Sequence, residues 1–181
     1  MSNRFLGRFL MTATMLAGTG IALANSGDTD IAKSLTHELR MYTRYTIWDD
    51  VNFRVANGQV ELNGAVNQPF KKAEMGRIAQ RVAGVTTVKN NIKVLPLSPF
   101  DDGLRLRVAR AIYGDPVMQR YAVNPNPSIH IVVENGHVTL TGFVANEMDK
   151  NIAGIRAGGA GLAFGPVVNK LQVEAKPAKK S

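Results

Sequence analysis

The chain has 181 residues, with 22 Lys and Arg against 14 Asp and Glu, a net charge of +8, 45% apolar residues and no cysteine. At roughly 150 residues per domain, this length allows one domain or two small ones, and the composition is too apolar and too weakly charged for a disordered chain. A sequence without cysteine excludes disulfide frameworks, cysteine-ligated zinc, iron–sulfur clusters and thiol nucleophiles.

Residues 1–24 have the pattern of a secretory signal peptide. Arg4 and Arg8 make a positively charged start, an uncharged apolar stretch follows, and Ala22-Leu23-Ala24 forms a small-residue cleavage box. A membrane anchor is the alternative, but the stretch is short for a span and is diluted by threonine and glycine. We therefore expect cleavage after Ala24. Loss of two arginines and no acidic residue leaves a mature chain with a net charge of +6 outside the cytoplasm.

The first predicted helix begins near residue 30. Asp28 or Asp30 can cap it, and its apolar positions recur at helical spacing: Ile31, Leu35, Leu39 and Tyr42. Tyr45 and Trp48 follow in a loop. These two rings could lie at the headgroup level of a membrane, or Trp48 could belong to the core.

The next segment repeats later in the chain. Residues 51–66 align without a gap with residues 129–144, and each copy has alternating apolar residues around an Asn-Gly pair, Asn57-Gly58 or Asn135-Gly136. This is the strongest local signal for a β-hairpin with a two-residue turn. The turn sets the register and predicts these pairs: Val51 with Gly64, Phe53 with Leu62, Arg54 with Glu61, Val55 with Val60, Ile131 with Leu140, Val133 with Val138, His130 with Thr141 and Glu134 with His137.

A helix and a strand follow each hairpin. Pro69 and Gly84 bound the first of these helices, and alternating residues from Val88 to Val94 predict the strand. The second copy begins at Asp101 or Asp102, which precede a helix with Leu104, Val108 and Ile112 on one face. Its last strand is predicted at Val167 to Val173, after a glycine-rich helix that should be weak because each interior glycine costs about 1 kcal/mol.

The sequence therefore predicts an α+β protein of two tandem αββαβ modules, each a small three-stranded sheet packed on two helices. We assign residues 1–24 to the signal peptide, 30–95 to the first module, 96–100 to a short linker, 101–174 to the second module and 175–181 to a basic disordered tail. Val132 and Val168, apolar residues on an otherwise polar sheet face, are candidates for packing between the modules.

These features resemble the BON domain, a small αββαβ module found in tandem in bacterial periplasmic and outer-membrane proteins, including osmotically inducible ones. The residues that carry the resemblance are Asn57-Gly58, Val60, Leu62, Gly64, Val66, Ala79, Val82, Gly84-Val85, Val88 and Asn90 in the first copy, and Asn135-Gly136, Val138, Leu140, Gly142, Val144, Val167, Asn169 and Leu171 in the second. The resemblance implies a periplasmic, non-enzymatic protein that binds phospholipid or holds envelope components together, with a role under osmotic stress.

The sequence contains no pattern typical of an enzyme. His37, His130 and His137 are expected to be separate surface imidazoles, and no Ser-His-Asp spacing, nucleophile elbow or helical His-Glu-x-x-His is present. Gly158 to Gly161 mimic the G-x-x-G loop that grips nucleic acid, but the element order differs and the chain is exported, so close packing is the preferred interpretation. We expect no cofactor, no metal, no catalytic residue and no nucleic-acid partner.

The basic residues are the candidates for function. The lipid-binding candidates are Arg105, Arg107, Arg110, Trp48, Lys176, Lys179 and Lys180; Lys71, Lys72, Arg77 and Arg81 are expected on the surface of the helix after the first hairpin. The predicted structural turn glycines are Gly58, Gly64, Gly84, Gly136 and Gly142. The predicted partner is an anionic phospholipid surface, bound peripherally. Two alternatives stay open: a chaperone-like or scaffold module that binds envelope proteins through a strand edge, and a ring-forming subunit.

Overall fold

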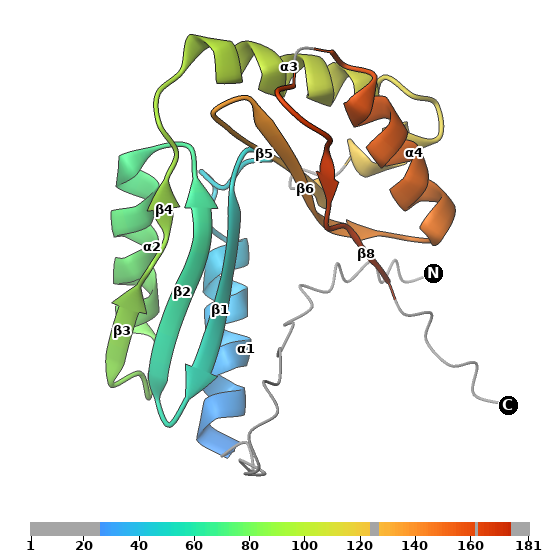
Figure 1. Cartoon of the computed structure of the whole chain (residues 1–181). Coiled ribbons are helices and arrows are strands. Elements are labelled where there is room, and N and C mark those ends of the chain that lie inside the picture. The colour runs from blue at the N-terminus through green and yellow to red at the C-terminus, as the bar shows by residue number, and fades with distance from the viewer. Residues whose placement is uncertain (1–25, 124–126, 162, 175–181) are drawn as a thin grey trace, which may run out of the picture.

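The computed structural model describes residues 26–123, 127–161 and 163–174, which form two α+β modules (Figure 1). The predicted signal peptide and basic tail lie outside the described residues. Within the described ranges, no helix is long and apolar enough to cross a membrane.

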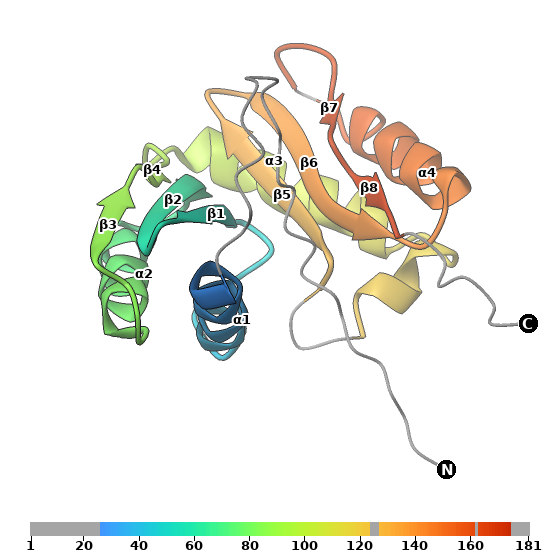
Figure 2. The ribbon, with the colours of Figure 1, turned by 90° about the horizontal axis from the view of Figure 1, so that it is seen from below.

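The first module contains α1 (Ser26–Arg40), β1 (Asp50–Ala56), β2 (Gln59–Val66), α2 (Pro69–Arg81), β3 (Thr87–Asn90) and β4 (Lys93–Val94). β1 is antiparallel to β2, whereas β3 and β4 are parallel to β2. In Figure 2, α1 and α2 lie side by side beneath this sheet. The core between the helices and the sheet includes Leu35, Leu62, Met75 and Ile92, all fully buried.

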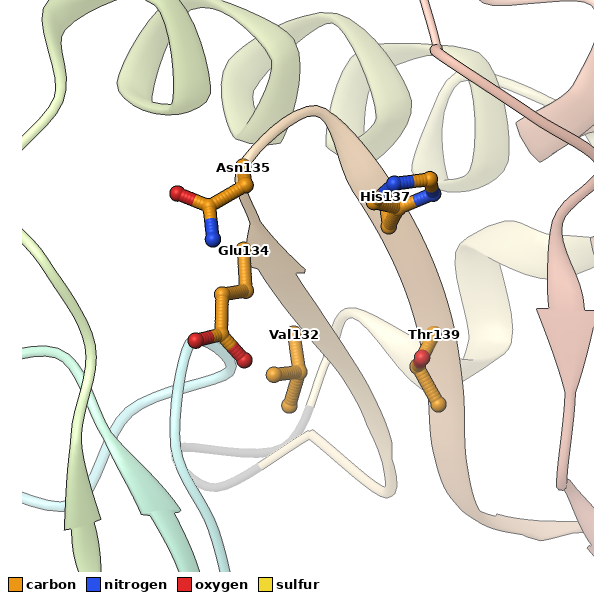
Figure 3. A pocket seen from close by; sticks show the side chains of 5 residues that line it. All are labelled: Val132, Glu134, Asn135, His137 and Thr139. Carbon is orange, nitrogen blue, oxygen red and sulfur yellow. The ribbon is translucent and has the colours of Figure 1, made fainter.

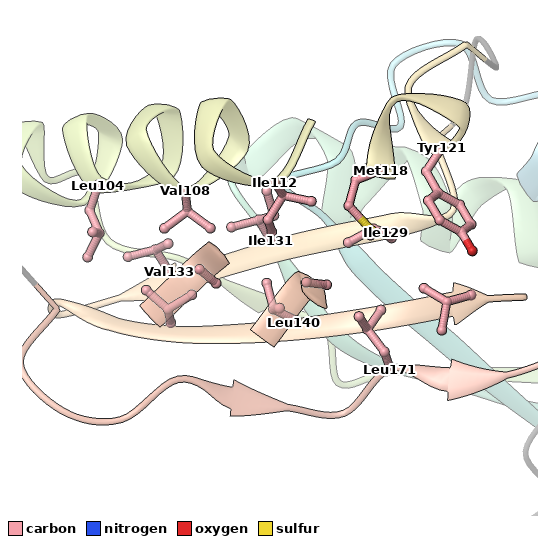
Figure 4. Packing of buried hydrophobic residues seen from close by; sticks show 14 residues of the cluster. Leu104, Val108, Ile112, Met118, Tyr121, Ile129, Ile131, Val133, Leu140 and Leu171 are labelled. Atoms are coloured by element: carbon pink, nitrogen blue, oxygen red, sulfur yellow. The ribbon is translucent and has the colours of Figure 1, made fainter. Parts of the chain in front are cut away.

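The second module contains α3 (Pro99–Tyr113), the 3₁₀ helix η1 (Met118–Tyr121), β5 (Ile129–Glu134), β6 (His137–Val144), α4 (Glu147–Gly158), β7 (Val168–Asn169) and β8 (Gln172–Val173). Its sheet repeats the topology of the first. Figure 4 shows side chains from α3, η1, the hairpin and the last strand meeting in one apolar cluster that includes Leu104, Ile112, Ile131, Leu140 and Leu171.

The predicted hairpin registers are confirmed. Every pair predicted for the two hairpins is present, including Phe53 with Leu62 and Ile131 with Leu140. The two-residue Asn-Gly loop sets this register. Burial of one face maintains it, because a slip of one residue would move every apolar side chain to the other face.

The helix caps differ from the prediction. α3 begins at Pro99, inside the predicted linker, and its cap is Ser98, whose Oγ accepts a hydrogen bond from the Asp101 backbone N–H at 3.1 Å. Asp101 instead accepts from the backbone N–H groups of Asn135 and Gly136, both at 2.8 Å. Asp28 lies inside α1 and holds the first Asn-Gly turn in the same way, also at 2.8 Å. Each turn is therefore held by an aspartate of the module's first helix.

The last strand of each module is divided in two, where the sequence predicts one continuous strand. In the first module Asn90 Nδ2 donates to the Lys72 carbonyl oxygen at 2.8 Å, and Asn90 Oδ1 accepts from the Ile92 N–H at 3.2 Å. Asn169 makes the same two bonds in the second module, at the same distances. The backbone still pairs at the break, where the Asn91 N–H donates to Leu62 and the Lys170 N–H to Leu140, both at 2.8 Å. The asparagine side chain ties the strand to the second helix.

All five predicted turn glycines have positive φ, but two of them lie within strands. Gly64 in β2 and Gly142 in β6 have φ of 115° and 102°. A Cβ at these positions would lie 2.0 Å from the carbonyl oxygens of Asp50 and Ser128. Only glycine permits this approach of neighbouring strands in this backbone conformation.

Candidate functional site

One exposed face of α3 combines arginine with aromatic side chains. Phe100, Gly103, Arg107 and Arg110 are spaced three or four residues apart, so they share one face of the helix. Arg110 is exposed and Arg107 partly exposed, and neither guanidinium has an ion-pair partner among the described residues. Among the predicted lipid-binding residues that the structure describes, these two arginines have side chains available to a partner.

Exposed apolar side chains gather at the start of this helix. Phe100 stacks on Phe164 with ring centroids 4.9 Å apart and an angle of 21° between the rings. Phe100 is 39% exposed, Phe164 67% and the adjoining Leu97 90%. Leu106 is also exposed, one residue before Arg107. We refer to Leu97, Phe100, Leu106, Arg107, Arg110 and Phe164 as the α3 surface.

Sequence reasoning missed the apolar members of this surface. Phe100 and Leu106 lie off the buried face of α3, which carries Leu104, Val108 and Ile112. The sequence did contain a signal for them: they are apolar residues outside the buried stripe of the predicted helix. Such side chains must be exposed on an amphipathic helix.

Arg105 is not part of the α3 surface. It is 5% exposed, and its Nη2 donates to the carbonyl oxygen of Val133 at 2.6 Å while Nη1 pairs with Asp102. Val133 lies in β5, an edge strand, so Arg105 satisfies a backbone group at that edge. Its guanidinium is therefore engaged inside the module and is not exposed to a lipid headgroup.

Trp48 is not part of the α3 surface either, and the role predicted for the C-terminal lysines stays a prediction. Trp48 is partly buried and packs against the apolar core of the second module, although it belongs to the first. Lys176, Lys179 and Lys180 lie outside the described residues.

Lys71 is buried, contrary to the prediction of a surface position. Its Nζ lies 2.6 Å from Asp49 Oδ2 and 2.7 Å from Asn67 Oδ1, and the side chains of Lys71 and Asp49 are 3% and 0% exposed. Because both side chains are buried, removal of either partner would leave the other as an unpaired buried charge and would destabilise the fold.

The segment from Tyr45 to Asp50 joins the two modules. The carbonyl oxygen of Ile47 accepts a hydrogen bond from the Ile131 N–H at 2.6 Å, so this segment pairs with the outer edge of β5. The rings of Tyr45 and His130 lie 5.2 Å apart, and His130 Nδ1 is 3.3 Å from the carbonyl oxygen of Thr46. His130 is buried here, so the prediction of a surface imidazole is wrong.

Burial controls the charge of two groups at this junction. Burial lowers the pKa of His130, and the nearby carboxylate of Asp50 opposes that effect only in part. Burial also raises the pKa of Asp50, against the influence of His130. The uncharged imidazole is therefore the stable form at neutral pH.

A shallow hollow of about 320 Å³ lies on the sheet face next to this junction, lined by Val132, Glu134, Asn135, His137 and Thr139 (Figure 3). Glu134 forms an ion pair with Lys93 of the first module. Val132 lines the hollow and Val168 is exposed, so the inter-module contact is made mainly by the segment from Tyr45 to Asp50 rather than by these two valines.

The described residues contain no group of three or more His, Asp or Glu side chains placed to hold a metal ion. His137 and His37 are exposed, and His130 packs against Tyr45. The described residues thus present an exposed surface of arginine and aromatic rings on two modules that are joined through backbone pairing.

Comparison with known proteins gives a family match. The BON domain family matches residues 27–96 and 115–175, which make up more than half of the chain. Two solved structures of CdsD, a structural protein of the type III secretion system of Chlamydia trachomatis, are similar at 16% identity; they match over 80% of this chain and 65% and 61% of their own, with TM-scores of 0.31 and 0.32. The chain thus spans less than two thirds of either structure. No curated protein matches.

Proposed function

Because this chain belongs to the BON domain family, we propose that it is a non-enzymatic periplasmic protein that binds anionic phospholipid surfaces and supports envelope integrity, including under osmotic stress. The observation that supports this proposal is the α3 surface. It places unpaired arginines beside exposed aromatic and aliphatic side chains on one helix face.

The composition of the α3 surface suits the edge of a bilayer. Each Arg or Lys near an anionic membrane contributes about 1 kcal/mol to binding. Phe and Leu side chains on the exposed face of a helix insert at the boundary between headgroups and acyl chains. Phe100 and Phe164 supply such side chains, and Arg107 and Arg110 supply the charge, so together they favour reversible peripheral attachment.

The alternative, binding of envelope proteins by an exposed strand edge, meets an obstacle at β5. Three outward-facing backbone groups of β5 already have partners. The Ile129 carbonyl oxygen accepts from Tyr113 Oη at 2.7 Å, the Ile131 N–H donates to Ile47, and the Val133 carbonyl oxygen accepts from Arg105. An edge satisfied in this way offers few groups for an added strand.

Vesicle co-sedimentation of residues 25–181 tests the proposal. We expect the protein to pellet with phosphatidylglycerol vesicles, to stay in solution with phosphatidylcholine vesicles, and to be released by high salt, because salt screens exposed charges. Equal pelleting with both vesicle types, or none with either, would contradict phospholipid binding. Binding of unfolded protein that resists salt would favour the strand-edge alternative.

A further inference from the structure

A second basic surface lies in the first module, away from the residues of the α3 surface. A hollow of about 380 Å³ opens between α2 and the loop that follows α1. Tyr42, Thr43 and Arg44 line it from the loop, and Glu74, Arg77 and Arg81 line it from α2. Three arginines and one acidic residue therefore line the same hollow.

That carboxylate is already engaged. Glu74 Oε2 accepts a hydrogen bond from Tyr42 Oη at 2.5 Å, and Glu74 Oε1 accepts from Arg44 Nη1 at 3.1 Å. The Arg44 guanidinium also lies over the ring of Phe70, 5.3 Å from its centroid. Glu74 thus positions Tyr42 and Arg44 at the rim, and within the described ranges its ion pair is with Arg44 and not with Arg77 or Arg81.

Arg77 and Arg81 are exposed and have no hydrogen-bond or ion-pair partner within the described ranges. They are four residues apart on α2, where like charges repel and weaken a helix. The second module folds without them, since its aligned positions carry Ile155 and Gly159. Arg81 lies in the last turn of α2, where a cation is favourable for the helix dipole, whereas Arg77 has no such role.

We propose that this hollow binds the phosphate group of a phosphate ester, with Arg77 and Arg81 as its principal ligands and Arg44 at the rim. Guanidinium groups donate paired hydrogen bonds in a plane, which matches the oxygens of a phosphate group. A bound dianion would relieve the repulsion between Arg77 and Arg81. Thr43 also lines the hollow and is a neutral residue with a hydroxyl donor. The site does not depend on the α3 surface or on membrane binding.

Titration with inorganic phosphate, followed by backbone amide NMR of the mature protein, tests this site. We expect saturable shifts at residues 42–44 and 77–81, with a dissociation constant on the order of millimolar. The double variant Arg77→Gln/Arg81→Gln should weaken binding about tenfold or more, since charge-assisted bonds to both arginines are lost. Arg77→Lys/Arg81→Lys should restore part of the affinity because it keeps the charge.

The matched control removes two cations elsewhere in the same module, Arg54→Gln/Lys89→Gln, and should bind phosphate like the wild type. All four side chains are exposed, so each variant should keep a dispersed amide spectrum. Absence of saturable shifts in the hollow, or equal weakening by the control, would overturn the proposal.

A second arm distinguishes the sources of the phosphate group. It compares the wild type and Arg77→Gln/Arg81→Gln for binding to vesicles that contain phosphatidic acid. If phosphate titrates the hollow, weaker vesicle binding by the variant supports the site and assigns it to a lipid headgroup, and unchanged vesicle binding supports it as a site for a soluble phosphate ester. Failure of the wild type to bind any anionic vesicle would contradict the proposed membrane function and leave the phosphate result to stand by itself.

Discussion

Asn90 and Asn169 determine how closely the second helix of each module approaches its last strand. The side chain of each asparagine bonds to a helix carbonyl and to its own strand. A Cβ on Gly76 or Gly154 would lie 2.8 Å from the Nδ2 of the matching asparagine. Because both ends of the amide are held by hydrogen bonds, it cannot move without breaking one of them.

Substitution of these glycines tests this contact. We expect Gly154→Ala to lower the free energy of unfolding by about 1–3 kcal/mol through overpacking. Gly158→Ala, one turn later in α4, has nothing within 4 Å of the new methyl group and should be neutral or stabilising by at most about 1 kcal/mol. Urea unfolding measures both, and equal effects of the two substitutions would contradict the packing described for Asn169.

His130 makes stability depend on pH. Its pKa is lowered by burial in the folded protein, whereas in the unfolded chain it is near the ordinary value of 6.5. The unfolded state therefore binds more protons as pH falls below 6.5, and the contribution of His130 to folding decreases. The charged and titratable neighbours of His130 are Asp49, Asp50 and Tyr45. The pKa of Asp50 is raised in the folded protein above its unfolded value of 3.8, so Asp50 has the opposite effect and adds stability as pH falls.

The difference between the wild type and His130→Phe reports the histidine together with its coupling to Asp50, because His130 lowers the pKa of that carboxyl. Both effects have the same sign, since the pKa of Asp50 is raised further when His130 is absent. We expect the wild type to lose stability relative to His130→Phe between neutral pH and about pH 5. Unfolding free energies measured across this range test the prediction. A difference that stays constant, or that changes in the opposite direction, would show that His130 takes up its proton as readily when folded as when unfolded.

At the scale of elements, each hairpin depends on an aspartate from the preceding helix. Asp101 is 0% exposed and accepts both N–H groups of its turn, while Asp28 makes the same bonds in a partly exposed setting. A helix and a hairpin far apart in the sequence are thus connected through one carboxylate in each module.

Removal of these carboxylates should have unequal effects. Hydrogen bonds to a charged group contribute about 1.5–3 kcal/mol each, and buried donors left without a partner cost more than exposed ones. We expect Asp101→Ala to cost about 3 kcal/mol and Asp28→Ala about 1 kcal/mol in urea unfolding. An effect of Asp28→Ala as large as that of Asp101→Ala would contradict the role assigned to burial.

An ion pair lies at the same place in both modules, but its positive and negative partners are interchanged. In the first module Asp49 before β1 pairs with Lys71 at the start of α2. In the second, Asp149 at the start of α4 pairs with Arg120 and accepts from Tyr121 Oη. The Asn67 N–H donates to Asp49 at 3.0 Å, and the aligned Ala145 N–H donates to Tyr121 at 2.8 Å. The position is retained while the sign of each partner is reversed.

Local patterns predicted the hairpins, since two adjacent residues and an alternating pattern determine their register. Local patterns failed for Lys71, Arg105 and His130, because these residues are buried by parts of the chain that come together only on folding. Besides nearby Asn67 and Asp102, Lys71 contacts Asp49, 22 residues away, and Arg105 contacts Val133, 28 residues away. His130 faces the other module. The α3 surface was predicted in part: its arginines follow from charge, but Phe164 joins it only through stacking across the module.

At the scale of the whole molecule, the two modules form one unit through the segment from Tyr45 to Asp50. Ile47 extends the β5 edge, Trp48 enters the second core, and Lys93 pairs with Glu134 beside them. This contact covers part of the polar sheet face of the second module and leaves α3 with an exposed face. The α3 surface therefore lies on a helix whose opposite face is packed in the core of the second module.

The most direct measurement of the central claim is the affinity of the wild type, Arg107→Gln/Arg110→Gln and Arg54→Gln/Lys89→Gln for phosphatidylglycerol vesicles at low salt. If α3 carries membrane binding, removal of its two arginines should weaken binding by about tenfold to thirtyfold, at about 1 kcal/mol per charge. The control, with the same net charge, should bind nearly as the wild type does. Equal losses in the two variants, or none in Arg107→Gln/Arg110→Gln, would contradict the claim that this surface binds the membrane.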